Sequence, residues 1–200
     1  MPGQKKQRTE VAQQVEAQLA TPIEHETIST IARNLNLDTW QVGGFALGIH
    51  HIEPSFPDWF YARKETLDLI KLFRQNVQQT FNTVFVGSPG VGTSTLVVLL
   101  ALYMALHQQK RVVLFRKLKA DEFSMLCLDP VHQQYWRKHT KSIAGLDLVG
   151  DRDFELCLDG FLREEIDHDL INFHRLTRFR MLATCTQYDM KNDETRIRRK

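Results

Sequence analysis

The chain has 200 residues, 42% of them hydrophobic, and its 26 basic and 24 acidic side chains leave a formal net charge of +2. This length suits one sizeable folded core, or a core with a small appendage, and the near-neutral charge gives no overall attraction to nucleic acid. No stretch holds about 18 uncharged apolar residues and the N-terminus lacks an apolar run, so the sequence predicts neither a membrane span nor a secretory signal.

Cysteine and histidine usage argues against a disulfide framework or a metal centre. Cys127, Cys157 and Cys185 are odd in number and widely spaced, and two of them sit in apolar runs typical of buried cysteine. The neighbouring His50 and His51 have no cysteine or carboxylate at ligand spacing. Basic runs such as residues 111–119 are interpreted as solvated surface.

The N-terminal part predicts a small helical region. Residues 1–22 are rich in Gln and charge, and helical periodicity then runs through Ile28, Ile31, Leu35 and Leu37. The spacing over residues 28–42 also fits a helix-turn-helix, with Val42 as a core position. The second helix expected around residues 38–42 carries no Arg or Lys, so an ordinary helical hairpin is favoured over DNA binding.

A connector containing several glycines and prolines follows, and it ends in an amphipathic helix. Gly43, Gly44, Gly48, Pro54 and Pro57 punctuate the connector. In the stretch "YARKETLDLIKLFRQNVQQ", one helical face is expected to carry Leu67, Ile70, Leu72 and Phe73.

From there strands and helices alternate, which predicts an α/β fold. Strands are expected at 83–86, 112–115, 154–158 and 181–185, and helices at 94–107, 120–138 and 164–176. This order predicts a P-loop NTPase three-layer sandwich with a parallel sheet, preceded by a small helical N-terminal region. The expected domains are residues 1–53, a helical region and connector, and residues 54–200, the P-loop NTPase-like domain.

The stretch "VFVGSPGVGTSTLVV" has the pattern of a phosphate-binding loop, in which glycines turn backbone N–H groups inward and a hydroxyl ligates Mg²⁺. Thr93 stands where the pattern GxxxxGK[ST] places lysine. Losing a charged hydrogen bond worth roughly 1.5–3 kcal/mol predicts binding weaker by about one to two orders of magnitude. The alternative is a strand-to-helix turn without a ligand. The predicted nucleotide-binding residues are Gly87, Ser88, Pro89, Gly90, Val91, Gly92, Thr93, Ser94 and Thr95.

Two later strands carry further candidates for this site. The apolar strand in "FELCLDGF" ends in Asp159, the expected partner of Ser94 in holding Mg²⁺, although an ordinary Asp-Gly turn is the alternative. In P-loop ATPases two acidic residues follow this aspartate, but here Leu162 and Arg163 stand at those two positions. The catalytic candidates are therefore Glu164 and Glu165, one turn further on. The strand in "RMLATCTQYD" could present polar side chains to a terminal phosphate, with candidates Thr184, Thr186 and Gln187.

Five segments together resemble the P-loop ATPase module of the crinkler effectors of oomycetes, and the retrotransposon-hot-spot proteins of trypanosomes are similar. They cover about residues 54–195 and read "FYARKETLDLIKLFRQ", "VFVGSPGVGTSTLVVLLALYMAL", "KRVVLFRKLK", "LCLDGF" and "LATCTQYDMKNDE". By position, Gly87–Ser94 match the phosphate loop and Asp159 matches the Mg²⁺ carboxylate.

The resemblance implies a secreted effector that binds ATP and Mg²⁺ and acts in the host nucleus or cytoplasm through host proteins. The terminal "RIRRK" would suit nuclear import, although a soluble basic tail is the alternative. Thr93, the missing translocation header and the absence of an effector domain after residue 200 predict a truncated or decaying member, a pseudo-ATPase. A scaffold for protein interaction without nucleotide is the competing hypothesis.

Overall fold

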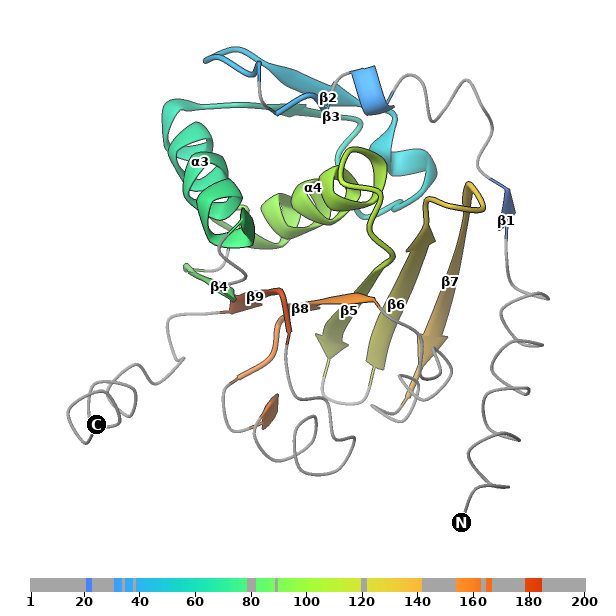
Figure 1. Ribbon diagram of the computed structural model, residues 1–200. Helices are drawn as coiled ribbons and strands as arrows, with labels where there is room; N and C mark the ends of the chain where they lie inside the picture. The colour runs from blue at the N-terminus through green and yellow to red at the C-terminus, as the bar shows by residue number, and fades with distance from the viewer. Residues whose placement is uncertain are drawn as a thin grey trace.

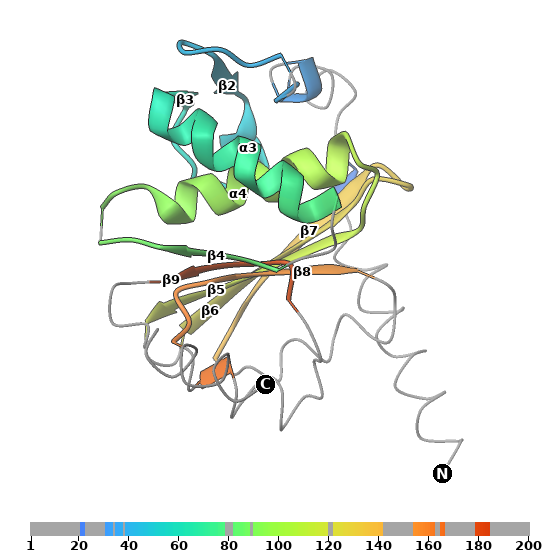
Figure 2. The same cartoon turned by 60° about the vertical axis from the view of Figure 1, so that its left-hand side comes forward.

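The computed structural model describes residues 21–22, 31–33, 35–37, 39–78, 82–88, 90–119, 122–141, 154–162, 165–166 and 179–184. These residues form an α/β structure in which two helices cover one face of a mixed seven-stranded sheet (Figures 1 and 2). The helices are α3 (Lys64–Gln78) and α4 (Thr93–Leu106). A separate two-stranded antiparallel sheet, β2 (Phe45–Leu47) with β3 (Trp59–Tyr61), flanks the 3-10 turn η1 (Ile49–His51).

The large sheet has the order β1-β7-β6-β5-β8-β9-β4. Its strands are β1 (Thr21–Pro22), β4 (Thr83–Val86), β5 (Val112–Lys119), β6 (Glu122–Asp129), β7 (Gln134–Thr140), β8 (Glu155–Asp159) and β9 (Met181–Thr184). The four strands β4, β9, β8 and β5 run parallel, whereas β6, β7 and β1 continue the sheet with antiparallel pairing. The α/β prediction is therefore confirmed, and the predicted parallel sheet is present in part, as four parallel strands within a mixed sheet.

The helix predicted over residues 120–138 is wrong for the part of that stretch that the structure describes. Most of that stretch is the β6–β7 hairpin, which pairs in antiparallel register from Phe123↔Thr140 to Asp129↔Gln134. In β6, every residue from Phe123 to Leu128 is buried, because the strand is covered on both faces. A strand buried on both faces has no alternating pattern, so its periodicity cannot be told from that of a buried helix.

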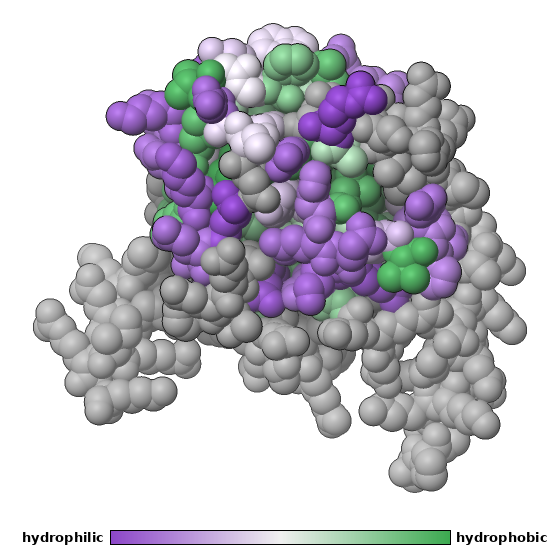
Figure 3. Space-filling model, turned by 45° about the horizontal axis from the view of Figure 1, so that its top comes forward, coloured by the Kyte–Doolittle hydropathy of each residue, from purple (hydrophilic) through white to green (hydrophobic). Residues whose placement is uncertain are grey.

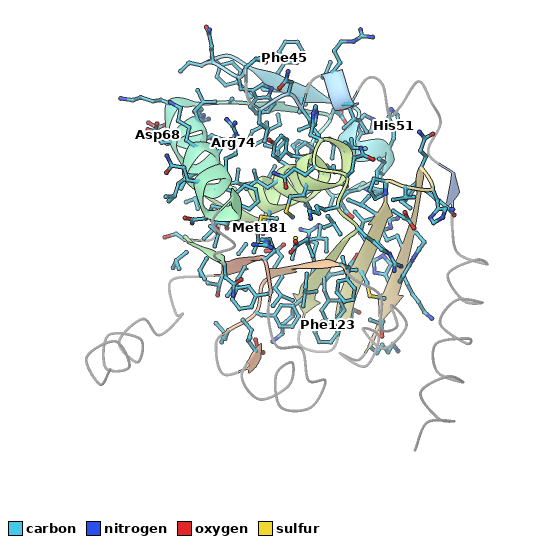
Figure 4. The ribbon with its side chains drawn as sticks, in the orientation of Figure 1. Phe45, His51, Asp68, Arg74, Phe123 and Met181 are labelled. Carbon is cyan, nitrogen blue, oxygen red and sulfur yellow. The ribbon has the colours of Figure 1, made fainter. Side chains whose placement is uncertain are left out.

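Two apolar cores lie on opposite sides of the sheet. The core on the helix side includes Met181 and almost all of α4, whose residues from Leu96 to Ala105 are buried. On the other side, Phe115, Phe123 and Phe161 stack on one another with ring centroids 5.3–6.0 Å apart. Figure 4 shows Met181 and Phe123 on these two sides. Of the helix predicted over 164–176, the structure describes only two residues, Glu165 and Ile166, both helical.

The N-terminal segment joins the helix-side core. Ile31, Leu35 and Leu37 are buried in the same cluster as α4, and β2 pairs with β3 across the domain boundary predicted after residue 53. The described residues on the two sides of that boundary therefore pack together. The boundary itself stays a prediction.

The helix-turn-helix alternative is not supported by the part of this segment that the structure describes. Residues 39–42, where the second helix was expected, are not helical, and Val42 is 62% exposed rather than a core residue. Ile28 and Asp38 lie outside the described residues. In α3, Leu67, Ile70 and Phe73 are buried as predicted, but Leu72 is 49% exposed and lies off the buried face.

Cys127 and Cys157 are fully buried, as their apolar surroundings predicted, and Cys185 lies outside the described residues. Burial raises the pKa of the Cys157 thiol well above its ordinary value, and the nearby Glu155 carboxylate acts in the same direction. The Cys157 thiol is therefore neutral and is not a reactive nucleophile at neutral pH.

The turn between β6 and β7 carries a pH-sensitive pair, in which Asp129 Oδ2 lies 2.8 Å from His132 Nδ1. Burial raises the pKa of Asp129, but hydrogen bonds from His132, with the positive charges of His132 and Arg111, outweigh it and lower the pKa overall. A carboxyl with a lowered folded pKa stabilises the fold above its unfolded pKa, and this contribution is lost as the pH falls through the folded pKa. We expect His132→Ala to raise the pKa of Asp129 in an NMR titration. An unchanged pKa would contradict this account.

Candidate phosphate-binding site

The predicted phosphate loop lies between the end of β4 and the start of α4. Parallel strands end at a common edge, so the loop shares that edge with the ends of β8 and β9. Gly90 (φ 87°) and Gly92 (φ 90°) adopt the left-handed conformation that glycine tolerates best. Gly92 is the N-cap of α4 and has no side chain, so it cannot cap the first N–H groups of the helix.

Gly87 is required by close packing at the base of the loop. A Cβ atom there would lie 2.6 Å from Val91 Cγ2 and 2.9 Å from Thr93 Cγ2. The loop therefore folds back over β4. Thr93, Ser94 and Thr95 are half-buried, whereas Ser88 and Val91 are exposed, and Pro89 lies outside the described residues.

Two predicted site residues meet directly, although 65 positions separate them in the chain. The Ser94 hydroxyl, in the first turn of α4, donates a hydrogen bond of 2.8 Å to Asp159 Oδ1 at the end of β8. Asp159 is 6% exposed. Because Ser94 Oγ gives its proton to the carboxylate, its lone pairs remain available to a metal ion. The pair thus has the donor set that Mg²⁺ uses beside substrate phosphates.

A second set of polar residues, not identified from the sequence, surrounds Asp159. In the β5–β8 register Arg116 lies opposite Asp159, and Arg116 Nε donates to Asp159 Oδ2 over 2.9 Å. Arg116 Nη1 also contacts Glu53 Oε1 at 3.3 Å and the Ser55 hydroxyl. Ser55 Oγ in turn donates to Glu53 Oε1 over 2.5 Å. The connector of residues 43–57 is thereby tied to the loop edge of the sheet.

These contacts correct the interpretation of the basic run 111–119 as solvated surface. The Arg116 side chain is only 14% exposed and the Lys117 side chain 23%. The signal was present in the sequence, because Arg116 is the first charged residue after the apolar run of β5. Such positions, like that of Asp159, fall at the edge where parallel strands end.

The buried carboxylate of Glu53 is incompletely paired. Glu53 is 3% exposed, and its Oε2 atom has no hydrogen-bond partner among the described residues. A buried charged oxygen without a partner costs free energy.

Of the two catalytic candidates, the structure describes only Glu165, and its carboxylate is held by other groups of the protein. Glu165 Oε1 pairs with Lys117 Nζ, and Glu165 Oε2 accepts a 2.8 Å hydrogen bond from the Leu162 backbone N–H. Both oxygens of this carboxylate are thus engaged in holding the segment after Asp159. Glu164 lies outside the described residues.

Of the three candidates predicted on the strand over 181–185 and just after it, the structure describes only Thr184, at the end of β9. Thr184 is 4% exposed and donates its hydroxyl proton to the Phe161 carbonyl at 2.8 Å, so it braces the loop after β8 rather than facing a ligand. Thr186 and Gln187 lie outside the described residues. The strand's clearest role is structural, since Gly87 N–H donates to the Thr184 carbonyl at 3.1 Å.

Searches against protein-family models, curated proteins and solved structures found no match. Among the described residues, no group of three or more His, Cys, Asp or Glu side chains is arranged to hold a metal ion by itself. No helix in this part of the chain is long and apolar enough to cross a membrane.

Proposed function

We propose that the chain is a P-loop NTPase-like module that binds ATP with Mg²⁺ weakly and does not hydrolyse it efficiently. The observation that carries the proposal is the 2.8 Å hydrogen bond between Ser94 and Asp159. The sequence predicts for both residues the role of holding Mg²⁺, and they meet at the edge of the sheet where ligands bind in α/β folds. The alternative, a strand-to-helix turn without a ligand, does not predict a hydrogen bond between Ser94 and Asp159.

Each part of the site has a separate role in this proposal. The glycine loop and the first turn of α4 offer backbone N–H groups to the phosphates, and Ser94 with Asp159 would hold Mg²⁺. The metal, when bound, neutralises phosphate charge. Thr93 contributes a neutral hydroxyl in place of an ammonium, so binding is weak. Glu165 is engaged with Lys117 and with the Leu162 backbone N–H, so this carboxylate is not free to activate water.

The resemblance to the crinkler effectors extends the proposal to where the protein acts and what it contacts. On that resemblance, the module belongs to a secreted effector that acts in the host nucleus or cytoplasm by contacting host proteins. Only the five sequence segments quoted above support this part of the proposal.

A non-catalytic interaction scaffold is the second candidate function, and one surface favours it. On the β2–β3 sheet, the cross-strand pairs Phe45↔Tyr61 and Leu47↔Trp59 point outward, and each of these side chains is 38–62% exposed. Figure 3 turns this part of the molecule toward the viewer, and green and near-white atoms interrupt the purple surface there. Exposed aromatic side chains of this kind are common in protein interfaces.

Titration with Mg-ATP tests the nucleotide proposal. We expect the wild type to bind measurably and Thr93→Lys to bind about 10–100 times more tightly, because a charged hydrogen bond to phosphate is worth roughly 1.5–3 kcal/mol. Isothermal titration calorimetry gives both dissociation constants.

Val91→Lys is the matched control, because Val91 is an exposed residue of the same loop. If this variant gains as much affinity as Thr93→Lys, general attraction rather than a specific phosphate contact explains the gain. If neither the wild type nor Thr93→Lys binds Mg-ATP, the phosphate-loop assignment is wrong. The non-catalytic interaction scaffold is then the remaining candidate function.

A further inference from the structure

The two-stranded sheet of β2 and β3 has one buried face and one exposed face. On the inner face Ala46 pairs with Phe60; Ala46 is fully buried, and the Phe60 ring lies 6.0 Å from that of Phe56 in the helix-side core. These contacts fix the two strands, so the outer side chains are held in place before a partner binds. The outer face, called the β2–β3 face below, consists of four large side chains that are 38–62% exposed: Phe45, Leu47, Trp59 and Tyr61.

The outer edge of β2 is open. β2 lies farther from the helices than β3 (Figures 1 and 2), and among the described residues no strand pairs with its other side. The Ala62 N–H donates to the Gly44 carbonyl. The alternation of an antiparallel ladder therefore turns the backbone N–H and C=O groups of Phe45 and Leu47 away from β3. Charged side chains or proline usually shield such an edge, but residues 42–48 contain neither, so this edge can accept a further strand.

The size of the β2–β3 face distinguishes between candidate partners. Its three aromatic rings and one leucine expose roughly 300–450 Å² of apolar surface, since a whole aromatic side chain covers about 150–250 Å². A stable dimer needs about 800 Å² from each partner, so this face is too small to hold a second copy of the chain through side chains alone. A strand added to β2 also gains backbone hydrogen bonds along the open edge, which compensates for the small apolar area.

Charged residues at the two ends of the β2–β3 face indicate the polarity of such a strand. Asp58 is exposed and precedes β3 at the end where Leu47 pairs with Trp59, whereas the exposed Arg63 follows β3 at the opposite end. A strand that runs antiparallel to β2 starts at the Leu47 end. A basic residue at its start and an acidic residue at its finish would therefore each meet a charge of opposite sign.

We propose that β2 binds an extended segment of a partner protein as an added antiparallel strand, with alternate apolar side chains of that segment lying on the β2–β3 face. The segment begins with lysine or arginine and ends with aspartate or glutamate. This inference goes beyond nucleotide binding and does not depend on it. It names the kind of partner for the surface that favours an interaction scaffold.

A synthetic peptide tests the proposal on the full chain. The peptide has phenylalanine, valine and leucine alternating with threonine, lysine at its N-terminus and glutamate at its C-terminus, and the fluorescence anisotropy of a labelled copy gives the dissociation constant. Trp59→Ala should weaken binding by about 30-fold or more, because a tryptophan at the centre of an interface often contributes that much. Val131→Ala is the matched control and should leave binding unchanged. Val131 is 74% exposed in the turn between β6 and β7, away from β2 (Figures 1 and 2).

Backbone methylation of the peptide separates strand addition from simple apolar contact. N-methyl groups on alternate residues block every N–H along one edge of the peptide. The set that faces β2 should abolish binding, whereas the set shifted by one residue faces solvent and should preserve it. The same result for the two methylated peptides would overturn the inference, and so would a wild type that does not bind the unmodified peptide.

Two further outcomes would also count against the proposal. Equal binding by the wild type and Trp59→Ala would show that the β2–β3 face is not the binding surface. A dimer of the chain alone in analytical ultracentrifugation that Trp59→Ala disrupts would show that a second copy occupies the face. Titration with Mg-ATP is a separate measurement, so failure of this inference leaves the proposed nucleotide site untouched.

Discussion

Replacing Phe161 by alanine is expected to lower the free energy of unfolding by about 3–5 kcal/mol. Phe161 is fully buried and stacks on Phe115 and Phe123 in the core on the side of the sheet away from α3 and α4. Removing its ring leaves a cavity against two aromatic neighbours that are themselves fixed by strands. Urea denaturation followed by circular dichroism gives the change in the free energy of unfolding.

Phe45→Ala is the control for this prediction. Phe45 is 51% exposed on β2, at the outer edge of the molecule (Figure 4), so its loss should change the free energy of unfolding by less than about 0.5 kcal/mol. Similar losses for the two variants would mean that Phe161 is not part of a closely packed core. Phe161 lies two residues after Asp159, so its variant should also weaken ATP binding if the proposed function holds.

Gly160→Ala is expected to cost about 3 kcal/mol of unfolding free energy. Gly160 follows Asp159 with a φ of 83°, a conformation that costs other residues about 1–2 kcal/mol. A Cβ atom there would also lie 2.9 Å from the Lys117 carbonyl oxygen, a backbone atom of β5 that cannot turn away. Overpacking of this kind adds about 1–3 kcal/mol.

Gly90→Ala separates these two costs. Gly90 has nearly the same φ, 87°, but an added Cβ would meet nothing within 4 Å. Only the conformational cost of about 1–2 kcal/mol should remain. Equal unfolding free energies for the two variants, measured by chemical denaturation, would show that the contact with β5 has no influence.

The strand-loop-helix unit could be predicted from sequence because its signals are local. The apolar run of β4, the glycines after it and the uniformly apolar α4 each indicate their own structure within a few residues. Asp159 could be paired with Ser94 because a rule of parallel sheets places strand ends together. The helix expected over residues 120–138 failed because burial on both faces erases the alternation that identifies a strand.

The second set of site residues could not be predicted in the same way. Glu53 and Ser55 lie between η1 and β3, outside any helix or strand, and nothing in their spacing indicates that they reach Arg116. Their contacts depend on the register of β5 against β8 and on the packing of Ile49 and Ile52 into the helix-side core. Register and packing are properties of the whole fold. A local pattern does not contain them.

The pairing of β4 with β9 has a consequence for how the site forms during folding. β5, β6 and β7 are neighbours in sequence and joined by short connections, so their loops close at little entropic cost. β4 is different, since its parallel partner β9 is the last strand of the sheet in chain order. Contacts between such distant segments form slowly. We therefore expect the hairpins to form early and the phosphate loop to become ordered last, when β9 inserts between β8 and β4.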